Sequence, residues 1–127
     1  MLKILVVDDD IRVQRSLTAL LEGHEVICRS SVKDAKYALV MNMVEPFDVI
    51  ICDEAMPVEK GHTLINWCHE NPIDSKLIML TAVENDQEML SKIKYIEDVS
   101  ILNKPWDSKE LLNLVTGVIG SRTETAA

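Results

Sequence analysis

Polar side chains that could take part in chemistry follow four of the short apolar runs in this 127-residue chain, each where a run ends. Two acids follow the first run, and single residues follow the third, fourth and fifth, namely Asp8, Asp9, Asp53, Thr81 and Lys104. Three carboxylates held together repel one another, and one ammonium offsets only part of that charge. A hard divalent cation is the natural complement, and Mg²⁺ suits a few carboxylates with retained waters.

The same set of side chains meets the requirements of phosphoryl transfer. A metal ion and the Lys104 ammonium neutralise charge on the transferring group, while the Thr81 hydroxyl binds one of its equatorial oxygens. A carboxylate such as Asp53 can attack in line and take the group. These residues are far apart in the sequence, so the chemistry depends on a fold that brings the ends of the runs together.

Five apolar runs alternate with five helical patterns along the chain. The runs predict strands at residues 3–7, 24–28, 47–52, 77–80 and 99–102. Continuous apolar runs without alternation are typical of parallel strands buried on both faces. Five strand–helix repeats with short loops predict one open, doubly wound parallel α/β sheet, since five strands are too few for an eight-stranded barrel.

Local signals mark where the helices begin. Ser31 is predicted as the N-cap of the second helix, and Asp10 is interpreted as a cap of the first. Asn85 and Asp107 are each followed three residues later by a glutamate, which is the spacing of a capping box.

The fold also predicts where a ligand would bind. In an open parallel sheet, ligand sites form beyond the carboxyl ends of the strands, where the strand order reverses. This rule places the five polar residues at one edge of the sheet. Each of these residues could instead be an ordinary helix cap, a loop acid or a solvated charge. If all five were ordinary, their shared position at strand ends would be a coincidence. We therefore favour a shared site.

The composition indicates one globular domain. Apolar residues make up 47% and the formal net charge is −8, whereas a nucleic-acid surface needs a basic patch. No run reaches the length of a membrane span and no signal peptide is recognised, so we expect a cytoplasmic protein that contacts neither nucleic acid nor membrane. The domain is expected to cover residues 1–120, with 121–127 as a polar tail or the start of a linker.

Cysteine and histidine residues carry no metal-binding pattern. Cys28, Cys52 and Cys68 are odd in number and lack Cys-x-x-Cys spacing, so we interpret them as reduced, buried thiols. His62 and His69 fall on the helix around Cys68 without matching acids, and we predict that they lie at the surface.

The chain resembles the receiver domain of two-component response regulators over almost all of its length. The matching motifs are Val6-Val7-Asp8-Asp9, Asp53-x-x-Met56-Pro57-x-x-x-Gly61, Thr81-Ala82 and Lys104-Pro105. Each motif alone is weak, but all four in order at the ends of predicted strands are highly specific. The resemblance implies a flavodoxin-like and CheY-like sheet with the strand order 2-1-3-4-5.

The resemblance also implies a role for each acid. Asp53 would be the phosphoacceptor, which takes its group from the phosphohistidine of a histidine kinase or phosphotransfer protein. Asp9 and Asp53 would ligate Mg²⁺ together with the backbone carbonyl of Ala55, with Mn²⁺ as a substitute ion. Asp8 would act mainly through metal-bound water.

The other motif residues are implied to form the switch. Thr81 and Ala82 would bind the phosphoryl group, and Lys104 would pair with it, aimed by a cis peptide bond before Pro105. Phosphorylation would then bias the surface of the fourth helix, fifth strand and fifth helix, which a downstream effector or fused output domain reads. We expect a signalling switch without turnover activity. Whether phosphorylation also drives homodimer formation is left open by the sequence.

Three positions depart from the family pattern. Many receivers carry an aromatic residue where this chain has Ile101, so we expect no aromatic rotamer change on activation. Ala55 and Val83 stand where polar side chains can steer the hydrolytic water in family members. Their apolar character predicts a comparatively long-lived phosphoryl-aspartate.

Two alternatives stay open at this point. One is a small Mg²⁺-dependent phosphohydrolase in which Asp53 forms a turnover intermediate. Such enzymes usually carry the nucleophile on the first strand in an Asp-x-Asp setting followed by a Gly-Thr turn, and Asp8-Asp9-Asp10-Ile11 lacks that turn. The other is a docking module that keeps the fold but no longer takes phosphate. A turnover assay on phosphate monoesters and a titration with Mg²⁺ separate these alternatives from the switch.

Overall fold

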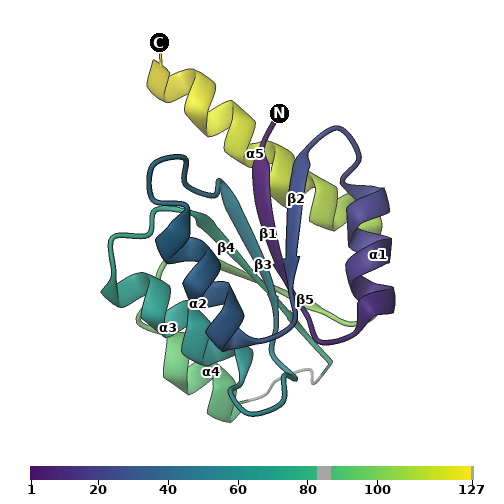
Figure 1. The fold of residues 1–127 in the computed structure, drawn as a ribbon, viewed down its shortest axis with the longest axis vertical. Coiled ribbons are helices and arrows are strands. Elements are labelled where there is room, and N and C mark those ends of the chain that lie inside the picture. Colours follow the sequence, from purple (N-terminus) through teal and green to yellow (C-terminus); the bar gives the residue numbers. More distant parts are fainter. Residues whose placement is uncertain (83–86, 127) are drawn as a thin grey trace.

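The computed structural model describes residues 1–82 and 87–126, with side chains described through residue 119. Strands and helices alternate along the chain as β1 Lys3–Val7, α1 Ile11–Leu20, β2 Glu25–Arg29, α2 Val32–Met41, β3 Val49–Asp53, α3 Gly61–Glu70, β4 Lys76–Thr81, α4 Gln87–Ile93, β5 Val99–Asn103 and α5 Ser108–Ala126. The strands form one parallel sheet in the order β2-β1-β3-β4-β5 (Figure 1). This order confirms the predicted doubly wound α/β fold.

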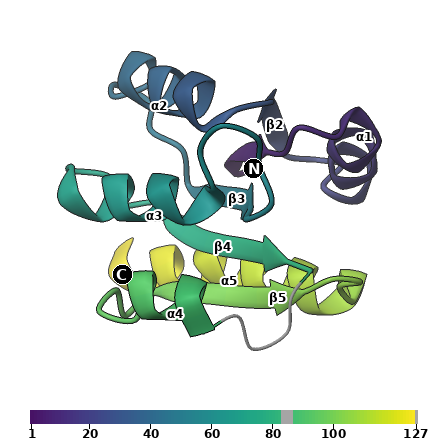
Figure 2. The ribbon, with the colours of Figure 1, turned by 90° about the horizontal axis from the view of Figure 1, so that it is seen from below.

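Helices cover both faces of the sheet (Figure 2). Side chains of α2, α3 and α4 pack on one face and those of α1 and α5 on the other. Neighbouring residues of β1 alternate between the two cores, with Leu5 and Val7 in the first and Ile4 and Val6 in the second. This two-sided burial explains why β1 is apolar at every position from Ile4 to Val7.

Burial also separates the central strands from the edges. All or nearly all residues of β1, β3 and β4 are buried, whereas β2 and β5 are mostly half-buried or exposed. The outer strand β2 begins with Glu25 and ends with Arg29, both exposed. Charged residues on a short edge strand discourage pairing with another sheet.

In α1, α2 and α5, the residue directly before the helix caps it with its side chain. The Ser31 hydroxyl accepts a hydrogen bond from the backbone N–H of Asp34 at 3.1 Å and so caps α2, as predicted. Asp10 before α1 and Asp107 before α5 each accept the N–H of the second residue after them, at 2.9 Å. The predicted cap Asn85 lies outside the described residues.

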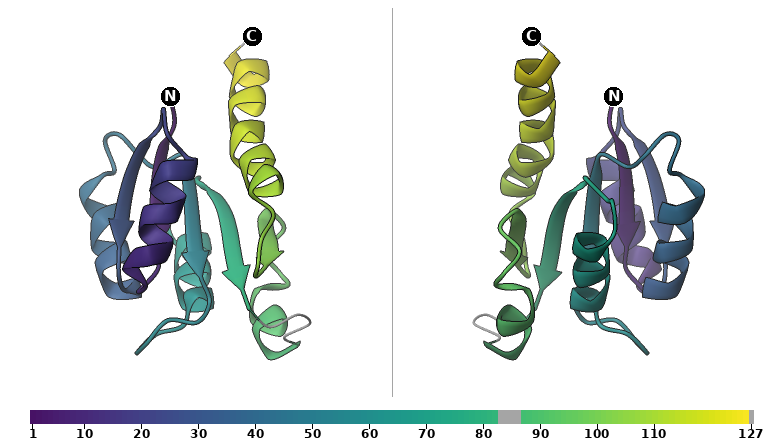
Figure 3. Two further views of the ribbon diagram at one scale, coloured as in Figure 1. Left: turned by 90° about the vertical axis from the view of Figure 1, so that its right-hand side faces the viewer. Right: turned by 90° about the vertical axis from the view of Figure 1, so that its left-hand side faces the viewer.

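The last helix is longer than the sequence suggested. Residues 121–126, expected to form a polar tail or the start of a linker, continue α5. Figure 3 shows this helix running past the edge of the sheet at which β1 begins. Among the described residues, no helix combines the length and apolar character needed to cross a membrane.

Candidate functional site

The carboxyl ends of the central strands bring the predicted acids together. One carboxylate oxygen from each of Asp8, Asp9 and Asp53 lies within 4.8 Å of the other two. Lys104, which follows β5, places its Nζ 2.9 Å from Asp53 Oδ1. Only 4% of the Asp53 side chain is exposed, against 26% of the Lys104 side chain. The cluster therefore combines the buried carboxylates of Asp8 and Asp53, the exposed carboxylate of Asp9 and the half-buried ammonium of Lys104.

Backbone hydrogen bonds hold the ends of β3, β4 and β5 in register. The Lys104 N–H donates to the carbonyl of Thr81 at 2.7 Å, and the Glu54 N–H donates to the carbonyl of Leu80 at 2.9 Å. Thr81 itself is buried at the end of β4. The Thr81 hydroxyl, the Lys104 ammonium and the Asp53 carboxylate thus lie at the ends of three adjacent strands.

Asp8 is the acid with the clearest electrostatic conflict. Burial raises the pKa of its carboxyl above the ordinary value, and the charge of Asp53 adds to this. The N–H of Asp10 donates to Asp8 Oδ1 at 2.8 Å, which favours the ionised form and opposes the shift. Asp8 is therefore a carboxylate that lacks enough positive charge around it.

Two carboxylate oxygens at the site accept no hydrogen bond from the described residues. Both Asp8 Oδ2 and Asp53 Oδ1 are buried, and the contact of Asp53 Oδ1 with Lys104 is an ion pair without hydrogen-bond geometry. Buried polar oxygens normally have partners. A hard divalent cation bound by oxygen ligands would satisfy both, so the donor set fits Mg²⁺.

Gln14 supports the acidic loop, and the sequence analysis missed it. Its side-chain amide donates to the carbonyl of Asp8 at 2.6 Å and to Ser30 Oγ at 3.1 Å. Gln14 precedes Leu17 and Leu21 by three and seven residues, so helical spacing puts it on the buried face of α1. A polar residue on an otherwise apolar face was the available signal.

The prediction that His62 lies at the surface is wrong. Its side chain and that of Glu54 are each 12% exposed, with His62 Nδ1 2.8 Å from Glu54 Oε2. The backbone N–H of His62 also donates to Glu54 Oε1 at 2.7 Å. Lys60, at the N-cap position of α3, makes no side-chain cap bond. The residue after Asp53 therefore caps α3, where a carboxylate is favourable.

The loop between β3 and α3 is anchored at several points. Ala55 lies in this loop, and the next residue, Met56, is buried and donates its N–H to the carbonyl of Glu54 at 2.9 Å. The N–H of Gly61 donates to the same carbonyl at 3.1 Å. Val58 is exposed with a φ of 69°, a conformation that β-branched residues rarely adopt. The loop that follows Asp53 thus contains one strained backbone conformation.

The remaining predicted positions lie around this cluster. Ile101 is half-buried against the core formed with α2, α3 and α4, and Ala82 is exposed directly after β4. The peptide bond between Lys104 and Pro105 is cis. Val83 lies outside the described residues, so its influence on a hydrolytic water stays a prediction.

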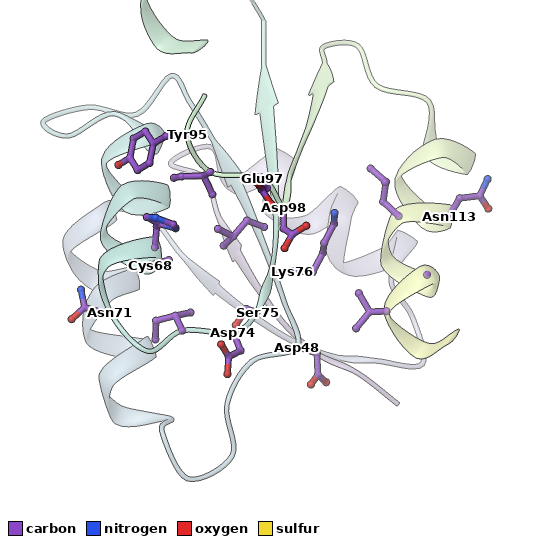
Figure 4. Close-up of a pocket in the computed structure, with 17 residues that line it drawn as sticks. Asp48, Cys68, Asn71, Asp74, Ser75, Lys76, Tyr95, Glu97, Asp98 and Asn113 are labelled. Carbon is purple, nitrogen blue, oxygen red and sulfur yellow. The ribbon is translucent and has the colours of Figure 1, made fainter. Parts of the chain in front are cut away.

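A pocket of about 1090 Å³ lies at the other edge of the sheet (Figure 4). Its walls include Asp48 directly before β3, Lys76 at the start of β4 and Asp98 directly before β5. These residues mark the amino ends of the strands. The pocket is therefore separate from the cluster around Asp53.

The three cysteines are free, as predicted. Cys52 and Cys68 are buried as predicted, whereas Cys28 is only half-buried. Burial raises the pKa of the Cys68 thiol to about 12. These thiols serve packing, and none of them joins the carboxylate cluster.

A five-stranded doubly wound sheet with acids, a threonine and a lysine at its carboxyl edge has the architecture of a CheY-like signalling domain. The chain matches the response regulator receiver domain family over residues 4–116 and belongs to that family. Asp8, Asp9, Asp53, Thr81 and Lys104 all fall within the matched residues.

Curated relatives are longer regulators of transcription. The hydrogenase transcriptional regulatory protein HoxA of Bradyrhizobium diazoefficiens is 28% identical over 97% of this chain, and the DNA-binding transcriptional regulator NtrC of Azospirillum brasilense is 31% identical over 98%. The matches cover 26% of HoxA and 25% of NtrC. The chain thus spans about a quarter of the length of these relatives.

Solved structures share the whole fold. The chemotaxis protein CheY4 of Vibrio cholerae is 27% identical with a TM-score of 0.77, over 93% of this chain and 98% of that one. A response regulator from Chloroflexus aurantiacus is 27% identical with a TM-score of 0.80, over 94% and 98%. The receiver domain of an HD domain-containing protein from Pseudomonas fluorescens, at 23% identity, has a TM-score of 0.82 over 98% and 90%, which shows the fold alone.

Proposed function

We propose that this chain is a phosphorylation-dependent signalling switch in which Asp53 accepts a phosphoryl group. The donor would be the phosphohistidine of a histidine kinase or phosphotransfer protein in the cytoplasm. The observation that carries the proposal is the setting of Asp53, a buried carboxylate 2.9 Å from the Lys104 ammonium and beside two further acids. An isolated structural acid needs no such setting.

Asp8, Asp9 and Asp53 would hold Mg²⁺, or Mn²⁺ in its place, together with the backbone carbonyl of Ala55. When bound, the ion neutralises charge on the transferring group. The Asp53 carboxylate attacks phosphorus in line, a bond forms from its oxygen, and the bond to the donor nitrogen breaks.

The protein side chains then hold the phosphoryl group. Lys104 already faces Asp53 and would pair with a phosphoryl oxygen, while the Thr81 hydroxyl would donate to another. Ala82, the next residue, would contribute its backbone N–H. The aspartyl phosphate adds about −1.5 to −2 charges at this edge, so these donors favour the arrangement in which they reach it.

The response would be read at the surface formed by α4, β5 and α5. Thr81 lies at the end of β4, and its carbonyl accepts the Lys104 N–H, so a shift at Thr81 is linked to the end of β5. Ile101 in β5 would take part by packing rather than by an aromatic rotamer change. The transcriptional roles of the curated relatives favour an output protein or fused output domain as the reader.

Intact mass spectrometry tests the acceptor directly. After incubation with Mg²⁺ and acetyl phosphate, the wild type should gain the mass of one phosphoryl group, and Asp53→Asn should gain none. Omitting Mg²⁺ should abolish the gain in the wild type. No gain with acetyl phosphate or with phosphorylated kinases would favour a docking module, and sustained turnover of phosphate monoesters would favour a phosphohydrolase.

The aspartyl phosphate should be comparatively long-lived. Ala55 and Val83 offer no side-chain hydrogen bond to a hydrolytic water. We expect that Ala55→Asn and Val83→Glu shorten the lifetime, measured as loss of the added mass after the donor is removed. A wild-type half-life of seconds at neutral pH would contradict this expectation.

A further inference from the structure

The outward side of α2 is apolar from Tyr37 to the end of the helix, and its other side is buried in the core. The exposed side chains are Tyr37, Val40 and Met41 in the helix and Val44 just after it, which we call the α2 stripe. Tyr37 is 69% exposed, Met41 65% and Val44 97%. A surface helix normally presents polar residues to solvent. The stripe departs from that pattern over its whole length.

The spacing of the stripe makes it continuous. Val40 and Met41 follow Tyr37 by three and four residues, which aligns them along one side of α2, and the exposed Val44 comes three residues after the helix ends at Met41. In Figures 1 and 2, α2 is the outermost element on its side of the sheet, and no other described helix or strand lies over it. Single exposed apolar residues are ordinary, but a contiguous row indicates a contact surface.

Opposite charges stand at the two ends of the stripe. Lys33 precedes Tyr37 by one helical turn on the same side of α2, and Glu45 follows Val44. Both are exposed, and neither side-chain charge has an ion-pair partner among the described residues. Two α2 helices packed antiparallel bring Lys33 of each copy toward Glu45 of the other, whereas parallel packing brings like charges together. The surface is therefore complementary to itself.

We propose that the α2 stripe binds a second copy of this chain, in an antiparallel α2–α2 contact about a twofold axis near Val40 and Met41. In such an interface both copies use the same residues. Four main side chains make a contact smaller than the roughly 800 Å² per partner of a stable complex, so the dimer is weak. The α2 stripe is separate from the surface of α4, β5 and α5. The association therefore requires neither Mg²⁺ nor phosphorylation and stands apart from the proposed function.

Sedimentation equilibrium of the unphosphorylated, metal-free protein tests the proposal. Between about 10 μM and about 1 mM, at moderate salt to screen the net charge of −8, the average mass should rise from 14.3 kDa toward twice that value. Val40→Glu places like charges at the twofold axis and should stay monomeric throughout. Ile11→Glu, at an exposed apolar position on α1, should associate like the wild type. Circular dichroism verifies that both variants are folded.

Charge reversal tests the antiparallel arrangement. Lys33→Glu and Glu45→Lys should each weaken association, since each puts like charges at both ends of the contact. The double variant should restore it. A wild type that stays monomeric over the whole range overturns the proposal, as does a Val40→Glu variant that still dimerises. A double variant weaker than both single ones overturns the antiparallel arrangement.

Discussion

Replacing Gly61 with alanine is expected to destabilise the domain by about 3 kcal/mol or more. A Cβ at this position would overlap the carbonyl oxygen of Asp53 and lie 2.9 Å from its carbonyl carbon and 3.0 Å from the Cα of Glu54. All three are backbone atoms at the end of β3, so they cannot rotate away as a flexible side chain does. Urea unfolding should show a clearly lower midpoint for this variant.

A second glycine supplies the matched control. Gly117 is exposed in α5, and a Cβ built there meets no atom within 4 Å. Gly117→Ala should therefore raise stability by about 0.5–1 kcal/mol, because alanine favours a helix interior. The same chemical change is thus expected to have opposite signs at the two positions. Equal midpoints for Gly61→Ala and the wild type would show that α3 does not approach β3 as described.

Replacing Asp8 with asparagine is expected to stabilise the metal-free protein and to remove most of its response to Mg²⁺. Asp8 is buried beside Asp53, so its charge is unfavourable without a cation. Asparagine retains an oxygen for the N–H of Asp10 but carries no charge. We therefore expect a higher unfolding temperature for the variant without metal. The wild type with Mg²⁺ at about 100 times its Kd should gain about 2.7 kcal/mol, which the variant should largely lack.

Thermal unfolding with and without Mg²⁺ measures both effects. Asp10→Asn is the control, because Asp10 is in the same loop but caps α1 and pairs with Arg12 instead of facing the cluster. Asparagine is also a good helix cap, so this variant should keep the stabilisation by Mg²⁺. Full stabilisation of Asp8→Asn by Mg²⁺ would mean that the ion binds elsewhere.

The sheet was predictable from the sequence because its central strands β1, β3 and β4 are apolar runs buried on both faces. The boundaries were less certain. The apolar pattern predicts that the third strand begins at Phe47, but β3 begins at Val49, although Phe47 is buried. The pattern likewise predicts that the second strand begins at His24, but β2 begins at Glu25, and the ring Nδ1 of His24 accepts the N–H of Leu2 at 3.0 Å. The apolar pattern alone does not distinguish a strand residue from a residue that is buried or hydrogen-bonded just outside the sheet.

The position of the candidate site was also predictable, because the ends of parallel strands share one edge. The supporting bonds were not. Glu54 and His62 are eight residues apart across a loop, and their contact depends on the path of that loop. No periodicity relates two such residues. Gln14 differs because its place on the buried side of α1 was visible in the spacing.

The sheet also separates two hydrophobic cores, one on each of its faces. Leu64 of α3 packs in one core and Val115 of α5 in the other, and adjacent residues such as Leu5 and Val6 contribute to opposite ones. Substitutions far apart and without shared contacts have additive effects on stability. Each layer of helices can therefore drift in sequence without compensating changes in the other. A lineage of such domains could remodel the α2 side for new partners while its α1–α5 side stays unchanged.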